Sequence, residues 1–111
     1  MPTLLPTDLN NNAIPAVRLK NDGAHIINAS AVSTRNTNAF DSDTRLVSLY
    51  ATGPVYICFG DNAVTATAND HYFPAGVYYD FAIGGGAVIQ YSHIAALAAD
   101  GDCTVYISEK E

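Results

Sequence analysis

The alternation of apolar and polar positions is clearest in residues 44–60, TRLVSLYATGPVYICFG, which we take as the organising segment of the chain. Because the side chains of a strand point alternately to its two faces, this segment predicts two short strands. One face of the first strand carries Leu46, Ser48 and Tyr50, and one face of the second carries Val55, Ile57 and Phe59. Between the strands, Gly53 permits unusual φ values, while Pro54 fixes φ and lacks a backbone donor. The segment therefore predicts a hairpin with a tight turn.

The same alternation predicts strands along the rest of the chain. These strands cover residues 14–20, 25–35, 77–83, 87–92 and 103–108, with a further short strand around Val64. In the strand 77–83, the inward positions are Val77, Tyr79, Phe81 and Ile83. Turns are predicted at Asn21-Asp22-Gly23, Phe73-Pro74-Ala75-Gly76 and Asp100-Gly101-Asp102.

Residues 93–99 allow two interpretations. Their alanine content and a capping Ser92 favour a short helix, whereas the turn around Gly101 and the strand after it favour a strand. We expect the strand. Short strands separated by turns every 8–12 residues predict an all-β fold, an antiparallel β-sandwich of the jelly-roll type. The tail, residues 109–111, is expected to be solvated.

The length of 111 residues corresponds to one domain. We expect residues 1–13 to form an extended N-terminal arm and residues 14–111 to form the sandwich, because prolines and three successive asparagines oppose regular structure in the arm. The apolar arm residues are Leu4, Leu5 and Leu9. They predict docking on a neighbouring subunit; docking on the chain's own domain, or disorder, remains open.

Charged residues make up only 14% of the chain, against about 25% in ordinary soluble domains. A polar but uncharged surface suits either an ordinary extracellular-type β domain or a subunit that packs against its own copies. The seven tyrosines suit core edges and subunit interfaces, and we expect Tyr72 and Tyr78 at an interface.

The net charge is −6, and the five basic residues are scattered. Nucleic acids and anionic membranes are therefore not expected as partners, since both require clustered basic residues. The N-terminus lacks the basic region of a secretory signal, and no apolar run reaches the ~20 residues of a membrane span. We expect a soluble product of the cytoplasm.

No catalytic, cofactor or metal site is predicted. The histidines His25, His71 and His93 share no ligand spacing, and the pairs Asp41/Asp43 and Asp100/Asp102 lack the spacing of a calcium loop. The turn at Phe73 is similar to the Pro-x-Gly corner of cupins, but Tyr79 stands where a cupin has a metal-binding histidine. Cys58 and Cys103 lack CxxC spacing and are expected as free thiols, although a disulfide between neighbouring strands remains open.

Three segments together resemble a known group of proteins: TRLVSLYATGPVYICFGDNAVTAT (44–67), YFPAGVYYDFAI (72–83) and TVYISEKE (104–111). The order resembles the small β-sandwich virion proteins of tailed phages, prophages and gene transfer agents. Phe73 stands where their corner usually carries leucine.

The resemblance implies a non-enzymatic protein, made in the bacterial host cytoplasm and attached to the outer surface of the virion head. There it acts as decoration or cement, or as the base of a spike or fibre. Its expected partners are its own copies, in a cyclic oligomer, and capsid protein or other virion proteins. The alternative is a carbohydrate- or receptor-binding module. A row of exposed tyrosines beside acidic loops favours that alternative, whereas tyrosines buried between subunits favour the virion role.

Overall fold

The computed structural model describes residues 7, 9–12, 17–86 and 88–111, and in this part of the chain all regular structure is β. The strands are β1 (Leu19–Ala29), β2 (Thr34–Arg35), β3 (Leu46–Ala51), β4 (Val55–Gly60), β5 (His71–Phe73), β6 (Tyr78–Ala82), β7 (His93–Ala98) and β8 (Cys103–Lys110). Among the described residues no helix is long and apolar enough to cross a membrane. The predicted all-β class is confirmed, as is the choice of a strand for residues 93–99.

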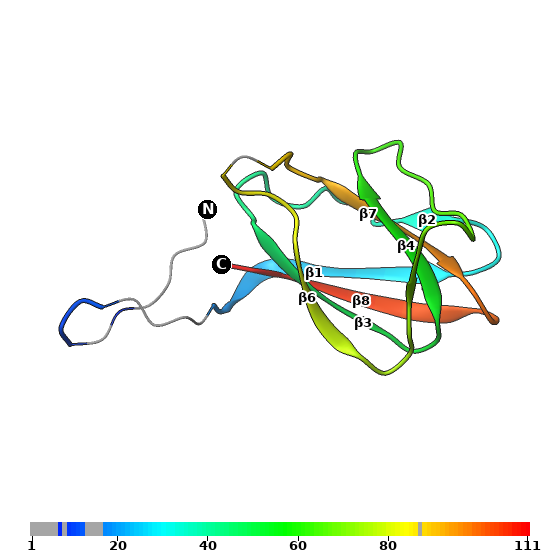
Figure 1. Ribbon diagram of the computed structural model, residues 1–111, viewed down its shortest axis with the longest axis horizontal. Helices are drawn as coiled ribbons and strands as arrows, with labels where there is room; N and C mark the ends of the chain where they lie inside the picture. The colour runs from blue at the N-terminus through cyan, green and yellow to red at the C-terminus, as the bar shows by residue number, and fades with distance from the viewer. Residues whose placement is uncertain (1–6, 8, 13–16, 87) are drawn as a thin grey trace.

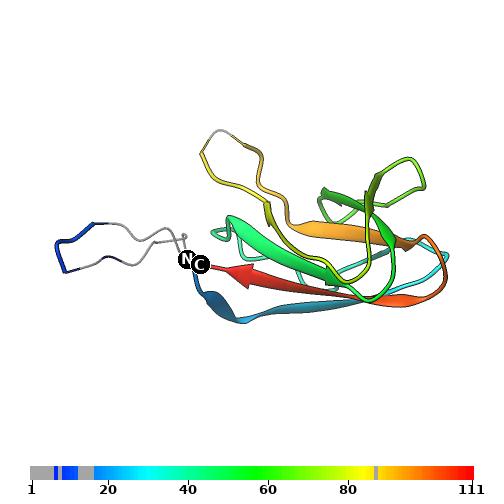
Figure 2. The ribbon, with the colours of Figure 1, turned by 60° about the horizontal axis from the view of Figure 1, so that its bottom comes forward.

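The strands form two antiparallel sheets of four, in the orders β1-β8-β3-β6 and β2-β7-β4-β5. Figures 1 and 2 show the two sheets packed face to face as a sandwich. Strand 1 pairs with 8, 2 with 7, 3 with 6 and 4 with 5, which is the pairing of one long hairpin rolled up into two sheets. This connectivity is that of a jelly roll, as the sequence predicts.

The core lies between the inner faces of the two sheets. Its largest fully buried side chains are Ile27, Val47, Leu49, Val55, Ile83, Ile94, Val105 and Ile107. Val47 and Leu49 alternate with outward residues of β3, and Val55 and Ile57 do the same in β4. The period-two pattern therefore divides both central strands correctly into two faces, and the structure shows which of the two is buried.

Residues 44–60 do not form a hairpin, and this prediction is wrong. β3 and β4 belong to different sheets, so Thr52-Gly53-Pro54 is a corner that leads from one sheet to the other. The corner is held against the start of β8, because Thr52 N–H donates to the carbonyl of Thr104 (2.9 Å) and Thr104 N–H donates to Thr52 Oγ1 (2.9 Å). These bonds direct β4 away from β3, which pairs instead with β8 and β6.

The predicted turn at Asn21-Asp22-Gly23 is also wrong, because it lies within β1. The register between β1 and β8 shifts between Leu19 and Ala24, and Asp22 has a φ of 63°. The extra residues form a bulge, which keeps the strand paired on both sides of it. Residues 14–16 of the strand predicted at 14–20 lie outside the described residues, as does most of the predicted arm.

Four further predictions need correction. Residues 88–91 form no strand and make only one isolated bridge, between Gly85 and Val88, and Val64 lies in a loop. Val77, just before β6, is exposed rather than buried. Tyr79 points to the inner face as predicted, because it pairs with the buried Leu49, but it is 57% exposed since β6 is the edge strand of its sheet. The tail is not solvated, because Glu109 is 3% exposed inside β8.

Candidate interaction surface

Four apolar and aromatic side chains form a continuous row across the outer face of the sheet β1-β8-β3-β6. The register pairs Ile26 with Tyr106, Tyr106 with Tyr50 and Tyr50 with Tyr78. The exposed fractions of these residues are 62%, 46%, 37% and 59% for Ile26, Tyr106, Tyr50 and Tyr78. Strands in a sheet lie about 4.8 Å apart, so the row extends roughly 14 Å. We call these four residues the aromatic row.

The rows on either side of the aromatic row are mostly polar and uncharged. One side carries Asn28 and Thr104, which pair with each other, and the other carries Ser108 and Ser48. The hydroxyl groups of Ser48 and Tyr78 form a hydrogen bond of 2.6 Å, which holds the Tyr78 ring over a buried serine.

At one corner of this sheet face, the charged side chains of Lys110 and Asp80 form an ion pair (2.8 Å). The Lys110 ammonium also lies 5.3 Å from the centre of the Tyr78 ring. Tyr78 is therefore held by a hydrogen bond and a cation–π contact, and is presented to solvent in a fixed position.

Part of the outer face of the second sheet is covered by its own chain. Residues 61–70 lie against it, since Arg35 donates to the carbonyl of Val64 (2.9 Å) and Ala66 N–H donates to Ser33 Oγ (2.8 Å). The uncovered part carries Tyr72, edge to face with Tyr56 at 5.8 Å between ring centres. Its exposed aromatic area is therefore smaller than that of the aromatic row.

The predicted interface residues do not form one cluster. Tyr78 belongs to the aromatic row, whereas Tyr72 lies on the other sheet, at the edge strand β5. Leu9 is fully exposed, and Leu4 and Leu5 lie outside the described residues. Ile26, Tyr50 and Tyr106 were not singled out from the sequence, because only the register between three separated strands aligns them.

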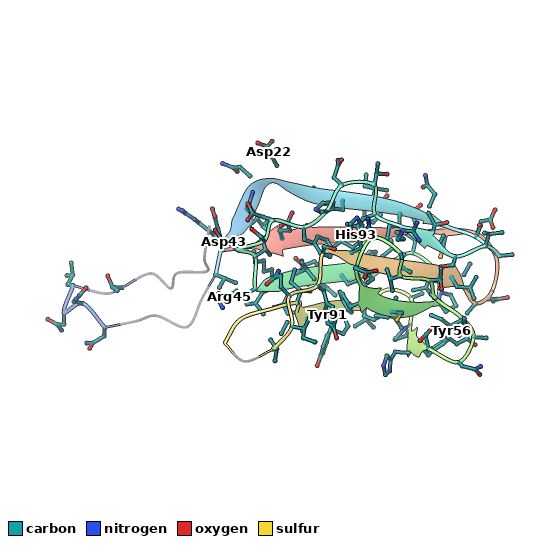
Figure 3. All side chains as sticks on the ribbon, turned by 90° about the horizontal axis from the view of Figure 1, so that it is seen from above. Asp22, Asp43, Arg45, Tyr56, Tyr91 and His93 are labelled. Atoms are coloured by element: carbon teal, nitrogen blue, oxygen red, sulfur yellow. The ribbon has the colours of Figure 1, made fainter. Side chains whose placement is uncertain are left out.

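A second apolar surface lies at the glycine-rich loop, residues 83–86 and 88–91. A groove of about 430 Å³ is lined by Ala82, Ile83, Val88, Ile89 and Tyr91. Figure 3 shows Arg45 and Tyr91 beside this loop. Val88 and Ile89 are 61% and 80% exposed, so two large aliphatic side chains project into solvent.

A polar cluster lies at the end of the sandwich that holds the chain's C-terminus. The Glu109 carboxylate accepts hydrogen bonds from Thr44 Oγ1 (2.6 Å) and from the backbone N–H of Asp41 (2.8 Å), and it contacts His25 Nε2 at 2.8 Å. His25 also packs edge-on against Phe40, with 5.0 Å between ring centres. Because Glu109 and His25 are buried, this cluster ties β1, β8 and the loop before β3 together rather than facing a ligand.

The acidic turn at Asp41 and Asp43 is stabilised by a hydrogen bond within the turn. The backbone N–H of Asp43 donates to the Asp41 carboxylate (2.9 Å), and this hydrogen bond lowers the pKa of Asp41. Within the described residues no group of three or more His, Cys, Asp or Glu side chains is placed to hold a metal ion.

Cys58 and Cys103 lie in different sheets and are both free thiols in the structure. Burial, and secondarily the nearby Asp70 carboxylate, raise the pKa of the Cys58 thiol. A raised pKa keeps the thiol protonated and poorly nucleophilic near neutral pH.

Comparison with known proteins gives little further information. No family model matches the chain, and no curated protein matches it. One solved structure comes from work described as "Bacillus endospore appendages form a novel family of disulfide-linked pili". It aligns at 22% identity over 78% of this chain and 81% of that chain, with a TM-score of 0.39, and a likeness this weak carries no argument.

Proposed function

We propose that this chain is a non-enzymatic structural subunit that assembles with its own copies and attaches to the outside of a phage or gene-transfer-agent capsid. The observation that carries self-assembly is the aromatic row, a solvent-facing line of Ile26 and three tyrosines. Interfaces are enriched in tyrosine and depleted of charge in their centre, and this sheet face has both properties. The attachment to a capsid rests on the sequence resemblance.

The composition supports packing between copies. Charged residues are only 14% of the chain, so two surfaces can meet without desolvating many ions. Repetition of one contact around a ring then converts weak single contacts into avid attachment to a particle. The proposal includes the place of the chain on the head, as decoration, as cement or as the base of a spike.

Mass spectrometry and antibody labelling of purified particles test the proposal. Particles from cells that produce them should contain the chain at a fixed copy number relative to the major capsid protein. Antibody against the chain should label intact particles from outside. Absence of the chain from particles that are otherwise complete would overturn the capsid role.

The alternative, a carbohydrate-binding module, is favoured by the same exposed tyrosines. Tyrosine rings stack on sugar faces, and the flanking Asn28, Thr104 and Ser108 side chains supply hydrogen-bonding groups for hydroxyls. Glycan-array binding that is lost in Tyr106→Thr, in a protein that stays monomeric, would favour this alternative over the structural role.

A further inference from the structure

The groove at the glycine-rich loop is a preformed apolar site. Gly85 and Gly86 have φ values of 106° and 60°, which permit the turn at its tip. Tyr91 N–H donates to the carbonyl of Ile83 (2.7 Å), and the Gln90 side chain donates to the carbonyl of Thr44 (2.8 Å). The loop is thus bonded to itself and to the segment before β3, and little ordering is left for a ligand to impose.

Aromatic stacking fixes the floor of the groove. The Tyr91 ring stacks on Phe59 at 5.8 Å between centres, and Phe59 packs on Phe81 at 5.5 Å. Val88 and Ile89 stand above this floor with most of their surface exposed. An apolar segment laid in the groove removes this aliphatic surface from water, at about 25 cal/mol for each Å² of apolar area.

The N-terminal arm of the same chain has the matching chemistry. Residues 1–12 read MPTLLPTDLNNN and contain three leucines, of which the described one, Leu9, is fully exposed. The only charged side chain of this segment is Asp8. Beside the groove, the cationic Arg45 side chain lies against Gly85, so its charge is opposite in sign to the single acidic residue of the arm.

Reach and direction favour the arm of a neighbouring copy. Sixteen residues precede Val17, and an extended chain spans about 3.3 Å per residue, so the arm reaches roughly 50 Å. In Figures 1 and 2, the described residues 9–12 lie beyond the end of the sandwich, and the glycine-rich loop projects at that same end. Parallel subunits in a ring place equal ends side by side, which brings one arm to the next groove.

We propose that the groove lined by Ile83, Val88, Ile89 and Tyr91 receives the leucine-bearing N-terminal arm of a second copy of this chain. The inference rests on the proposed self-assembly and specifies the contact that joins neighbouring subunits. It places the binding site for the arm in this groove. The aromatic row alone provides no such site.

Photo-crosslinking of the full-length protein tests this contact. Benzoylphenylalanine replaces Leu9, the protein is irradiated, and the products are separated on a denaturing gel and mapped by mass spectrometry. The expected product has the mass of a crosslinked dimer, with residue 9 joined to residues 82–91. The same probe at Val32, which is 72% exposed in the loop after β1, is the matched control and should not reach residues 82–91.

Two crosslinking outcomes contradict the inference. A product of monomer mass with residue 9 joined to residues 82–91 means that the groove holds the chain's own arm. No crosslink to residues 82–91 in a protein that sediments as an oligomer means that the arm binds elsewhere, while the proposed self-assembly stands. A protein that sediments only as a monomer instead removes the proposed self-assembly.

A substitution gives an independent readout. Ile89→Asn places a polar amide on the groove and should weaken assembly at least tenfold in dissociation constant, with an unchanged circular dichroism spectrum. Val32→Asn is the control of similar exposure and should leave assembly unchanged. Equal effects of the two variants, or no effect of Ile89→Asn, would overturn the assignment of the groove.

Discussion

Glu109 is the residue whose environment differs most from the sequence-based expectation. As the third residue from the C-terminus it suggests a solvated tail, yet it is 3% exposed and makes three polar contacts, with His25, Thr44 and the backbone of Asp41. Its partners lie 65 to 84 residues away in the sequence, so no local sequence pattern predicts these contacts. Only the fold brings these groups together.

Glu109→Ala should lower the free energy of unfolding by about 2–4 kcal/mol, because it leaves buried donors without an acceptor. Urea denaturation followed by circular dichroism measures the loss. Glu111→Ala is the matched control: its carboxylate faces the exposed Arg18 at 3.6 Å, and its removal should cost less than about 1 kcal/mol. Equal losses in the two variants would show that the buried cluster has no special role.

Cys58 gives a prediction on pH. The pKa of its thiol is raised in the folded protein, so the unfolded chain loses this proton first as the pH rises. The protonated Cys58 thiol therefore contributes fully to the free energy of unfolding below the pKa of the unfolded chain, near 9.0. This contribution is lost as the pH rises through the raised pKa of the folded protein. Urea unfolding at pH 7.5 and pH 10 should show a smaller fall in stability for Cys58→Ser than for the unmodified protein. An identical fall in both proteins would contradict the assignment.

At the scale of the elements, alternation predicts strands well and their partners poorly. The two faces of β3 and β4 follow directly from the period of two, because one face of each strand lies in the core. The choice between a hairpin and a corner between sheets depends on hydrogen bonds from Thr52 to β8, about fifty residues later. Likewise, the Asn-Asp-Gly sequence is typical of a turn but forms a bulge here, because β8 pairs with β1 on both sides of it.

The same limit applies to the candidate site. The exposure of Tyr78 follows from its position in an alternating strand, whereas the aromatic row depends on the register of four strands. The groove could not be predicted, because residues 87–92 have the alternation of a strand and the glycines before them redirect the chain into a loop.

Gly53→Ala tests the corner. A Cβ at this position would lie 2.8 Å from Cys103 Cβ, so the start of β8 must shift, at a cost of about 1–3 kcal/mol in unfolding free energy. The double variant with Cys103→Gly removes the opposing atom and should recover part of the loss, measured by the same urea titration. If the substitution costs as much in the Cys103→Gly background, the close approach is not its cause.

At the scale of the whole molecule, the jelly roll provides two different outer surfaces. One sheet is partly covered by residues 61–70, and the other presents the aromatic row to solvent. Large exposed apolar patches on small domains usually mark interaction sites. The described arm residues 9–12 and the groove lie at the same end, so the proposed arm contact and the sheet face together can close a ring.

Sedimentation velocity of the purified protein, with two neighbouring tyrosine variants, tests the central claim of self-assembly most directly. Tyr78 and Tyr79 are 59% and 57% exposed on the same strand but point to opposite faces, and threonine keeps β propensity at either position. We expect one species at a multiple of 11.7 kDa, shifted toward monomer by Tyr78→Thr and unchanged by Tyr79→Thr. A monomer of 11.7 kDa at all concentrations, or equal effects of the two variants, would contradict it.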